Sequence, residues 1–556
     1  MLEKLSRNDK IFWIAALILL AFRIFFGRFV GIWFKPRAYH DDALMVRYAD
    51  FHSHFIQQEL PFYDSMLKDM GYPVFLNLVH FSGLQYSDVV SILWFFAALT
   101  SVILFRKLTD SDSLKISLAI FAFVLFAPCA FDLWCGTRLY RNNVLAPFYF
   151  LNLNALAILF VMHFRNLHLS TKIFLPLQIL FGLIFTITYY LKEDGVWLMA
   201  VALFVFVLCT LKFFLQSELT LQNKFVHTLI LFLPLFIFYG GTVIHKEANL
   251  KYFGVYETNT RTAGEGGKFV ALIYKIKSEN RDWAHWAPAD ALQKAFEASA
   301  TLRADKKMQD LFMHSEWFKH DIVANPIHGD FLTWVTNKAI SESGYFKTAA
   351  ESESYFKKIN TELEAAFADG TLPREDKIQL VSSVGGRSIE EIFTLKRPML
   401  YIYNMHVFLY HYKPGVTTER LIEGKVEKQA VTLTNTDLYH GKTEEEKESR
   451  NRILKILFKI YMGVQGLLFV LALLGIFRGV IDIFRRKLKF SDEKFLILIV
   501  AGGFFILSLV YAFAIAWFSQ WLGSRSDTMK FYSVGIVPML MNFEIFGAYF
   551  LFKSKR

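Results

Sequence analysis

Long apolar runs separated by polar loops dominate the chain. Runs of about 20 apolar residues match the helix length needed to cross the hydrocarbon core of a bilayer. They lack the alternation of apolar and polar residues that marks the strands of a membrane β-barrel. The pattern therefore predicts an all-α integral membrane protein with about ten transmembrane helices. The predicted spans lie near residues 11–33, 88–105, 114–131, 144–164, 173–191, 196–215, 225–244, 453–477, 495–518 and 531–552.

The first long segment between predicted spans, residues 34–87, is only moderately hydrophobic. It contains the sequence Gly71-Tyr72-Pro73, and proline disfavours helical conformation in the residue before it. We therefore expect two short helices in this loop, separated by a break and lying along the membrane interface.

The second long segment, residues 245–452, is more polar. Amphipathic stretches such as Ala289–Arg303 and Tyr355–Ala368 alternate with turn-rich pieces such as Arg261–Gly267. Its length of about 200 residues is enough for a folded domain. The predicted organisation is an N-terminal transmembrane module (1–244, about seven spans), a large, mainly helical external segment (245–452) and a C-terminal transmembrane module (453–556, about three spans).

Charge supports an orientation for these spans. Hydrophobic residues make up 54% of the chain, and the formal net charge is +11. In a soluble protein this charge would suggest nucleic acid as a partner, but here the Lys and Arg residues collect in short loops on one side of the predicted spans. Cytoplasmic loops carry such an excess. We therefore expect both termini in the cytoplasm and no nucleic-acid partner.

The external loops contain charged residues that this orientation does not require. The first span is followed by Tyr39-His40-Asp41-Asp42. Three short external loops also carry charges, and their candidate residues are Arg138, Tyr140 and Arg141, then Lys192, Glu193 and Asp194, and finally Arg525. All of them are predicted on the same face of the membrane as Asp41 and Asp42.

Carboxylates and cations at one membrane face suit group transfer from a lipid phosphate. The guanidinium group of Arg presents a fork of donors that matches phosphate oxygens. A carboxylate can remove the proton of an acceptor hydroxyl, and fixed cations can stabilise the charge on a departing phosphate. The chain has no phosphate-cradling glycine loop and no dinucleotide motif, so no cofactor is predicted.

Each of these residues also has a structural interpretation. An Asp-Asp pair after a span is typical of an interfacial turn or helix cap. Arg138 and Arg141 are equally consistent with side chains that extend to lipid headgroups. An acidic pair can ligate Mg²⁺ or Mn²⁺, but Asp41 and Asp42 lack an evident set of further ligands, so no metal site is predicted. The three cysteines are too few and too badly placed for a disulfide framework or a zinc site.

The motifs resemble those of the GT-C superfamily of membrane glycosyltransferases, which use polyprenyl-phosphate sugars. Asp41-Asp42 is similar to the acidic pair in the first external loop of that superfamily, and the break at Gly71-Tyr72-Pro73 is similar to one found in many bacterial members. The loops around Arg138 and Lys192 resemble uncharacterised bacterial cell-envelope members. The chain departs from the superfamily at Arg525, which is followed by Ser526 and Asp527 where an Arg-Tyr pair is common.

The resemblance implies an inverting glycosyltransferase of the bacterial cytoplasmic membrane, with its active site on the external face. Its donor would be a polyprenyl-phosphate-linked sugar and its acceptor an envelope glycan or lipid. Asp41 would be the general base, with Asp42 the second choice. Arg138, Arg141 and either Lys192 or Arg525 would hold the lipid phosphate. His40, Tyr140, Glu193 and Asp194 complete the set of candidate substrate-binding residues.

Two other functions remain alternatives. A transporter or flippase for lipid-linked sugars would need polar residues through the middle of the bundle and matched halves with interrupted helices. The predicted spans are largely apolar, and no halves match. A noncatalytic partner in envelope assembly would use the 245–452 segment as a binding module.

Overall fold

Ten long helices account for the apolar runs. The computed structural model describes residues 6–167, 169–215, 220–314, 327–485, 488, 492–522 and 526–553. Ten helices among these residues are long and apolar enough to cross a membrane. They are α1 (Arg7–Val30), α4 (Tyr86–Thr109), α5 (Leu114–Leu125, extended by a turn at Pro128–Phe131), α6 (Asn142–Phe164), α7 (Thr171–Tyr189), α8 (Val196–Phe214), α9 (Leu221–Phe253), α19 (Glu444–Phe484), α20 (Glu493–Ser519) and α22 (Val537–Lys553). The prediction of an all-α multispanning membrane protein is confirmed.

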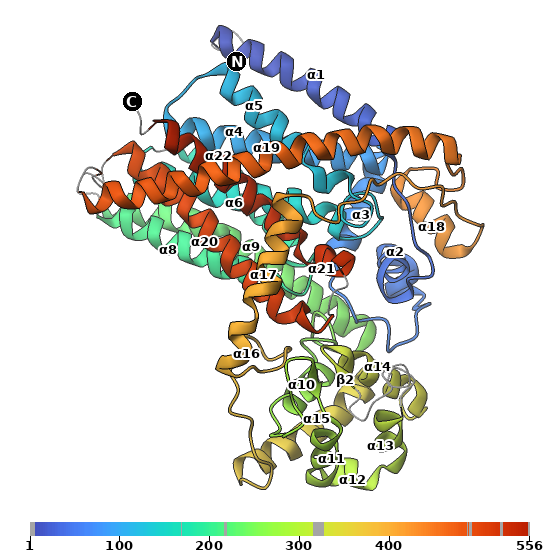
Figure 1. Ribbon diagram of the computed structural model, residues 1–556. Coiled ribbons are helices and arrows are strands. Elements are labelled where there is room, and N and C mark those ends of the chain that lie inside the picture. The colour runs from blue at the N-terminus through green and yellow to red at the C-terminus, as the bar shows by residue number, and fades with distance from the viewer. Residues whose placement is uncertain are drawn as a thin grey trace.

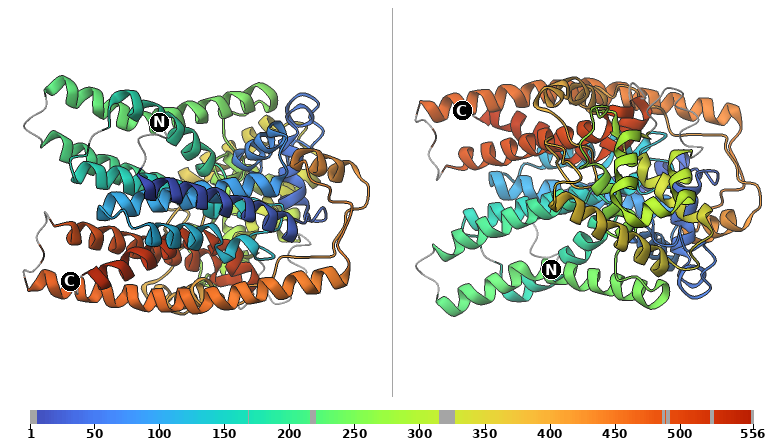
Figure 2. Two further views of the ribbon diagram at one scale, coloured as in Figure 1. Left: turned by 90° about the horizontal axis from the view of Figure 1, so that it is seen from above. Right: turned by 90° about the horizontal axis from the view of Figure 1, so that it is seen from below.

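The transmembrane helices pack in two flanking groups. Helix α7 packs on α9, and α22 packs between α19 and α20. Helix α4 contacts α1, α5 and α6. In Figure 2, α7–α9 lie on one flank and α19, α20 and α22 on the other, with α1 and α4 between them.

Helix α19 illustrates how the local sequence determines where a helix begins and how closely it packs on its neighbour. The Thr443 side chain accepts a hydrogen bond from the Glu446 amide and the Glu446 side chain accepts one from the Thr443 amide, so a capping box starts the helix. Its 41 residues make it roughly 60 Å long, about twice the thickness of a bilayer core. Gly475 lets it approach α22, because a Cβ atom at this position would lie 2.2 Å from the Gly547 carbonyl oxygen.

The first long loop contains two short helices, as predicted, α2 (Leu44–Ala49) and α3 (Gly71–Ser82). The break does not fall at Gly71-Tyr72-Pro73 as expected, because these three residues begin α3 and the interruption lies before them. Pro73 lies in the first turn of α3, where an amide has no helical partner and a proline costs little. Helix α18 (Lys425–Thr434) packs on both α2 and α3.

Residues 265–314 and 327–368 of the second long segment form a helical lobe, shown at the bottom of Figure 1. The lobe consists of α10 (Glu265–Ile273), α11 (Ala289–Ala298), α12 (Ala300–Ala304), α13 (Lys306–Met313), α14 (Phe331–Ser343) and α15 (Ala349–Ala368), with one short antiparallel pair, β1 (His285–Ala287) and β2 (Ile327–His328). Its core includes Phe269, which contacts the rings of Phe312 and Phe356 at 5.4 and 5.2 Å. The expectation of a turn at 261–267 is wrong for its last part, because Glu265–Gly267 begin α10.

The rest of the segment returns to the transmembrane helices. After the lobe come α16 (Ile389–Thr394) and α17 (Lys396–Val407). Helix α17 packs on α20 and on α21 (Ser526–Ser533), so residues 245–452 do not all belong to the lobe. Helix α9 also continues past the predicted boundary to Phe253, and α19 begins at Glu444.

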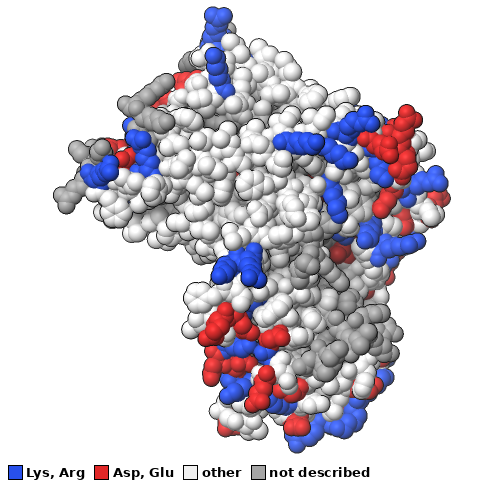
Figure 3. Space-filling view, viewed as in Figure 1, with Lys and Arg blue, Asp and Glu red and all other residues white. Residues whose placement is uncertain are grey.

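Surface charge follows this architecture. An almost uncharged belt covers the flank formed by α19 and α20, whereas Lys, Arg, Asp and Glu gather on the lobe and at the two ends of the bundle (Figure 3). The N- and C-termini lie at the end of the bundle opposite α2 and α18 (Figure 1), as an even number of spans requires.

Candidate functional site

The acidic pair lies on a single π-helical turn, Tyr39–Ala43, directly before α2. Two backbone hydrogen bonds connect Trp33, shortly before this turn, to the loop before α6. The Trp33 amide donates to the Thr137 carbonyl at 3.0 Å, and the Leu139 amide donates to the Trp33 carbonyl at 2.8 Å. Turns of this kind are rare and often occur at functional sites. The two carboxylates of the turn meet different surroundings.

Asp42 is completely buried and is paired with Arg138. The Arg138 guanidinium donates to its Oδ1 from Nε at 2.9 Å and from Nη2 at 2.5 Å, and the Lys35 amide donates to Oδ2 at 3.2 Å. Burial raises the pKa of Asp42 to about 6, although Arg138 opposes the rise. Asp42 does not line the cavity described below, so this geometry does not suit it to the catalytic role that we considered for it.

Asp41 instead presents its carboxylate to a cavity. Its side chain is 43% exposed, and its Oδ1 accepts a hydrogen bond from the Tyr140 hydroxyl at 3.0 Å. Oδ2 has only a longer contact, 3.8 Å, with Arg138. Burial would raise the pKa of Asp41, but Lys68, Arg138 and Arg141 together hold it below its ordinary value. At neutral pH, Asp41 is therefore an ionised carboxylate with one oxygen available to a ligand.

The cavity has a volume of about 1180 Å³ and lies between the lobe and the transmembrane helices α8, α9 and α20. This volume slightly exceeds the range of about 300–1,000 Å³ that is typical of small-molecule sites. One end of the cavity is charged and the other is apolar. The charged end includes His40, Asp41, Lys68, Asp69, Tyr140, Arg141, Lys192, Glu193, Asp194, Arg261 and Asp330. The apolar wing includes Val196, Trp197 and Ala200 of α8, Phe238 of α9, and Leu507, Val510, Tyr511 and Ala514 of α20.

Glu193 connects the lobe to the transmembrane loops at this charged end. Arg141 donates from Nη1 to its Oε2 at 2.8 Å, and Nη2 of Arg261 lies 3.0 Å from its Oε1. Burial would raise the pKa of Glu193, but the two arginines hold it well below its ordinary value. Because both guanidinium groups are engaged by Glu193, neither is a free cation.

Two lysines at the charged end are paired more loosely. Nζ of Lys68 lies 3.7 Å from Oδ1 of Asp41, and Nζ of Lys192 lies 3.6 Å from Oδ2 of Asp194. Both distances exceed those of strong charge-assisted hydrogen bonds. Both lysine side chains are buried. Burial lowers the pKa of Lys68 to about 8 and also lowers that of Lys192. These two ammonium groups are the cations best placed to contact an anionic ligand.

Most of the candidate residues named from the sequence meet in this one cavity. His40, Asp41, Tyr140, Arg141, Lys192, Glu193 and Asp194 all line it. Nε2 of His40 lies 3.5 Å from Oδ1 of Asp64. Arg138 lies behind the wall with Asp42, so the expectation that it holds a lipid phosphate is not met in this geometry. Arg525 lies outside the described residues.

Several cavity residues were not predicted from the sequence, namely Lys68, Asp69, Arg261, Asp330 and Trp334. The predicted candidates came from short loops, whereas these residues belong to the two long segments, in which charged side chains are ordinary. Trp334, from α14 of the lobe, lies over the site, with its ring centroid 5.3 Å from Nζ of Lys68. The adjacent charged residues Lys68 and Asp69, just before Gly71-Tyr72-Pro73, were the one feature of the local sequence that could have indicated a site here.

Among the described residues, no group of three or more His, Cys, Asp or Glu side chains is placed to hold a metal ion. The absence of a required metal or cofactor stays a prediction from the sequence.

Comparison with known proteins gives no family for this chain. No protein-family model matches it, and neither a curated protein nor a solved structure does. The case for a function therefore rests on the geometry of this cavity.

Proposed function

We propose that this protein is a glycosyltransferase that moves a sugar from a polyprenyl-phosphate carrier to an external glycan or lipid acceptor. One observation carries the proposal. A single cavity joins an available carboxylate, Asp41, and two loosely paired lysines to an apolar wing between transmembrane helices. Such a cavity suits a substrate with a long apolar tail, an anionic group and a polar sugar.

The apolar wing would take the polyprenyl chain. It lies between α8 and α9 on one side and α20 on the other, and Val510 of α20 is both in its lining and exposed at the surface of the bundle. A chain that moves from lipid into this wing keeps apolar surroundings throughout, so its transfer costs little desolvation energy.

The phosphate would lie near Lys68 and Lys192. This assignment revises the expectation from the sequence, which favoured Arg138 and Arg141. Arg138 is held by Asp42, and Arg141 is held by Glu193, so using either would break a buried ion pair. Lysine ammonium groups bind phosphate as point charges and need no fixed fork geometry.

The proposed reaction is a direct displacement. The acceptor hydroxyl gives its proton to Oδ2 of Asp41 while its oxygen forms a bond to the anomeric carbon of the sugar. The bond between that carbon and the phosphate oxygen breaks, and the oxygen keeps the electron pair. Lys68 and Lys192 stabilise the additional negative charge on the departing polyprenyl phosphate. Attack opposite the leaving group inverts the anomeric configuration.

The position of the cavity favours transfer over transport. Its lining residues include Tyr189, Tyr190 and Val196 around the loop between α7 and α8, and along α20 they extend only as far as Leu507, near the middle of that helix. A flippase for lipid-linked sugars would need a polar path that continues to the opposite ends of these helices.

The test is substitution of Asp41 by Asn in cells that lack the native protein. Mass spectrometry of envelope glycans and lipids should reveal a sugar-sized mass difference between cells with the wild-type protein and cells without it. Asp41→Asn should behave as the absence of the protein, because the amide cannot accept the acceptor proton. Asp50→Asn is the matched control, since Asp50 lies on the same loop and contacts Ser53 and Gln429 outside the cavity. Restoration of the sugar by Asp41→Asn would contradict the proposal.

A further inference from the structure

A row of exposed apolar side chains follows the lobe and precedes the return to the transmembrane helices. It consists of Ile378, Leu380, Val381, Ile389, Phe393 and Leu400, each between 42% and 73% exposed. Six exposed apolar side chains within one short segment are typical of an interaction surface. The row covers the loop before α16, helix α16 itself and the first turns of α17.

Packing places this segment against the lipid-facing helices. In Figure 1, α17 crosses the flank of α20 below α19, and α16 lies beneath it toward the lobe. The Tyr403 hydroxyl lies 2.6 Å from the Ser508 hydroxyl, within the apolar part of α20. Phe408 lies against Gly466 of α19, where a Cβ atom would be 2.9 Å from its ring. The segment therefore reaches the depth of the predicted spans.

The composition of α17 is typical of a membrane interface. Lys396 and Arg397 are exposed at its start, and the region beyond them is rich in tyrosine, including Tyr401 and Tyr410. Basic and aromatic side chains of this kind are enriched where the hydrocarbon core meets the lipid headgroups. Figure 3 shows Lys or Arg side chains at the level where the uncharged belt meets the lobe.

The loop before α16 is fixed to the outer end of α20. The Ile378 and Arg387 backbones exchange hydrogen bonds at 2.9 and 2.8 Å, which closes a hairpin. The Arg387 guanidinium donates to the Trp517 carbonyl at 2.7 Å and to Oε1 of Gln520 at 2.6 Å. In return, the Trp517 indole donates to the Gly385 carbonyl at 3.0 Å.

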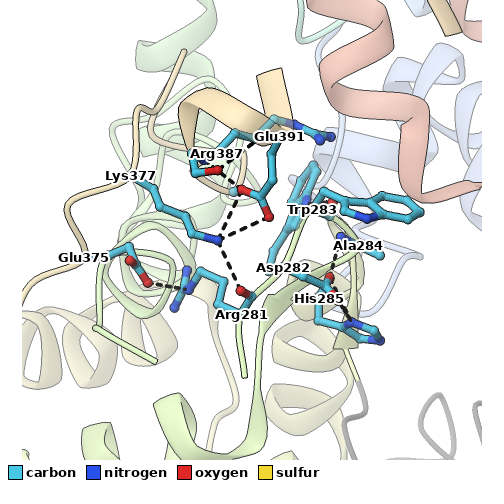
Figure 4. Close-up of polar contacts among 12 residues, drawn as sticks. Arg281, Asp282, Trp283, Ala284, His285, Glu375, Lys377, Arg387 and Glu391 are labelled. Carbon is cyan, nitrogen blue, oxygen red and sulfur yellow. Dashed lines mark hydrogen bonds and ion pairs between the residues drawn. The ribbon is translucent and has the colours of Figure 1, made fainter. Parts of the chain in front are cut away.

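A second set of contacts supports the base of this hairpin (Figure 4). Lys377 contacts Glu391 of α16 at 3.2 Å and donates to the Arg281 carbonyl of the lobe at 3.1 Å. The base is therefore held between the lobe, α16 and α20. The tip of the hairpin is different, because Leu380 and Val381 expose apolar surface and also line the cavity.

We infer that residues 378–400 insert into the outer interface of the bilayer and form the lipid-facing rim of the cavity. The partner is the outer-leaflet lipid itself. The hairpin tip would lie beside the apolar wing near α20, so a molecule that enters from the bilayer would pass Leu380 and Val381. This inference depends on the membrane-spanning architecture and not on glycosyl transfer, so it can fail or hold independently of the proposed function.

The test measures lipid contact at single labelled positions. The full chain is reconstituted in phosphatidylcholine vesicles, and the variants Leu380→Cys and Phe393→Cys carry a fluorescent nitrobenzoxadiazole label. Ile422→Cys is the water-exposed control, because Ile422 is an exposed apolar residue in the loop before α18. Phe204→Cys is the lipid-exposed control on α8. The three native cysteines are buried and should not react.

Phosphatidylcholine carrying a nitroxide on its acyl chain should quench the labels at 380 and 393 severalfold more than the label at 422, and nearly as much as the label at 204. Quenching at both positions equal to that at 422 would overturn the inference. Quenching at 393 but not at 380 would overturn the role of the hairpin as the rim of the cavity.

Discussion

Asp41 and Asp42 are consecutive residues, yet their carboxylates differ in exposure, in ion-pair geometry and in the direction of their pKa shifts. Asp42 has no exposed surface and is bound by the Arg138 guanidinium, whereas Asp41 has one oxygen open to the cavity. The sequence alone favoured Asp41 only through a resemblance. It could not show which carboxylate turns inward, because the partner of Asp42 lies 96 residues away.

Substitution of Asp42 by Asn should therefore reduce stability rather than remove a catalytic group. It would remove the charge that directly contacts the buried Arg138 guanidinium and leave only the carboxylate of Asp41, 3.8 Å away, so we expect a loss of about 3 kcal/mol. Thermal unfolding in detergent should detect a clear drop in melting temperature. Asp41→Asn is the matched control and should change the melting temperature little, because Asp41 is partly exposed. Equal destabilisation by the two substitutions would contradict this division of roles.

Lys68 should make binding of an anionic headgroup sensitive to pH. Burial lowers its pKa to about 8, so its ammonium group is charged below that pH and loses its proton as the pH rises through it. Affinity for undecaprenyl phosphate should fall above pH 8, with the charged fraction dropping about tenfold for each further pH unit. Lys68→Arg should keep its charge over this range and reduce the fall, whereas Lys68→Met should weaken binding at every pH.

Microscale thermophoresis between pH 6.5 and 9.5 would measure these affinities. An affinity for the wild-type protein that does not change up to pH 9.5 would contradict the assignment of Lys68 to the phosphate.

At the scale of elements, hydropathy was sufficient to find all ten long helices, because each carries an apolar run long enough to span a bilayer. The same criterion missed the interfacial character of α16 and α17, whose apolar stretches are short and interrupted by Lys396 and Arg397. It also missed Lys68, since no local pattern reveals that a residue of a long loop lines a cavity. Hydrophobic periodicity predicts secondary-structure elements, but only the packed structure shows which loops line the same cavity.

Glycine positions in α19 test how closely the helices pack. Gly475→Ala should destabilise the contact with α22, because the new Cβ would lie 2.2 Å from the Gly547 carbonyl oxygen and the helices would have to move apart. Overpacking of this kind costs about 1–3 kcal/mol. Gly463→Ala in the same helix is the matched control, because its Cβ would meet nothing within 4 Å. Thermal unfolding should separate the two variants, and equal melting temperatures would contradict the close approach.

At the scale of the whole molecule, the two transmembrane modules and the lobe contribute to one cavity. Asp41 comes from the first external loop, Trp334 from the lobe and Tyr511 from the C-terminal module. The number and approximate limits of the spans could be predicted from the sequence. Their assembly around a cavity could not, because it depends on contacts between residues more than a hundred positions apart, such as Arg387 with Gln520.

The orientation of the molecule is a prediction from the charge pattern that single cysteines can test. Glu423→Cys, in the loop before α18, should react with a membrane-impermeant maleimide in right-side-out vesicles. Asp112→Cys, between α4 and α5, should react only after the membrane is permeabilised. Background labelling should be low, because the native cysteines are buried. The opposite labelling pattern would reverse the predicted orientation.

The loop before α6, which is hydrogen-bonded to the chain beside the acidic turn, has a consequence for the synthesis of the protein. Asp132, at the start of this loop, is bound by Lys530 of α21 at 2.7 Å, a contact between residues 398 positions apart. At a translation rate of roughly 5–20 residues per second, roughly 20–80 s separate the synthesis of the two partners. The turn that carries Asp41 therefore leaves the ribosome long before its support is complete. A chain whose synthesis stops before α21 would contain Asp41, Lys68 and Lys192 but would lack the Lys530 contact that helps to fix the Arg138 loop. Such a truncated product should lack the proposed transfer activity.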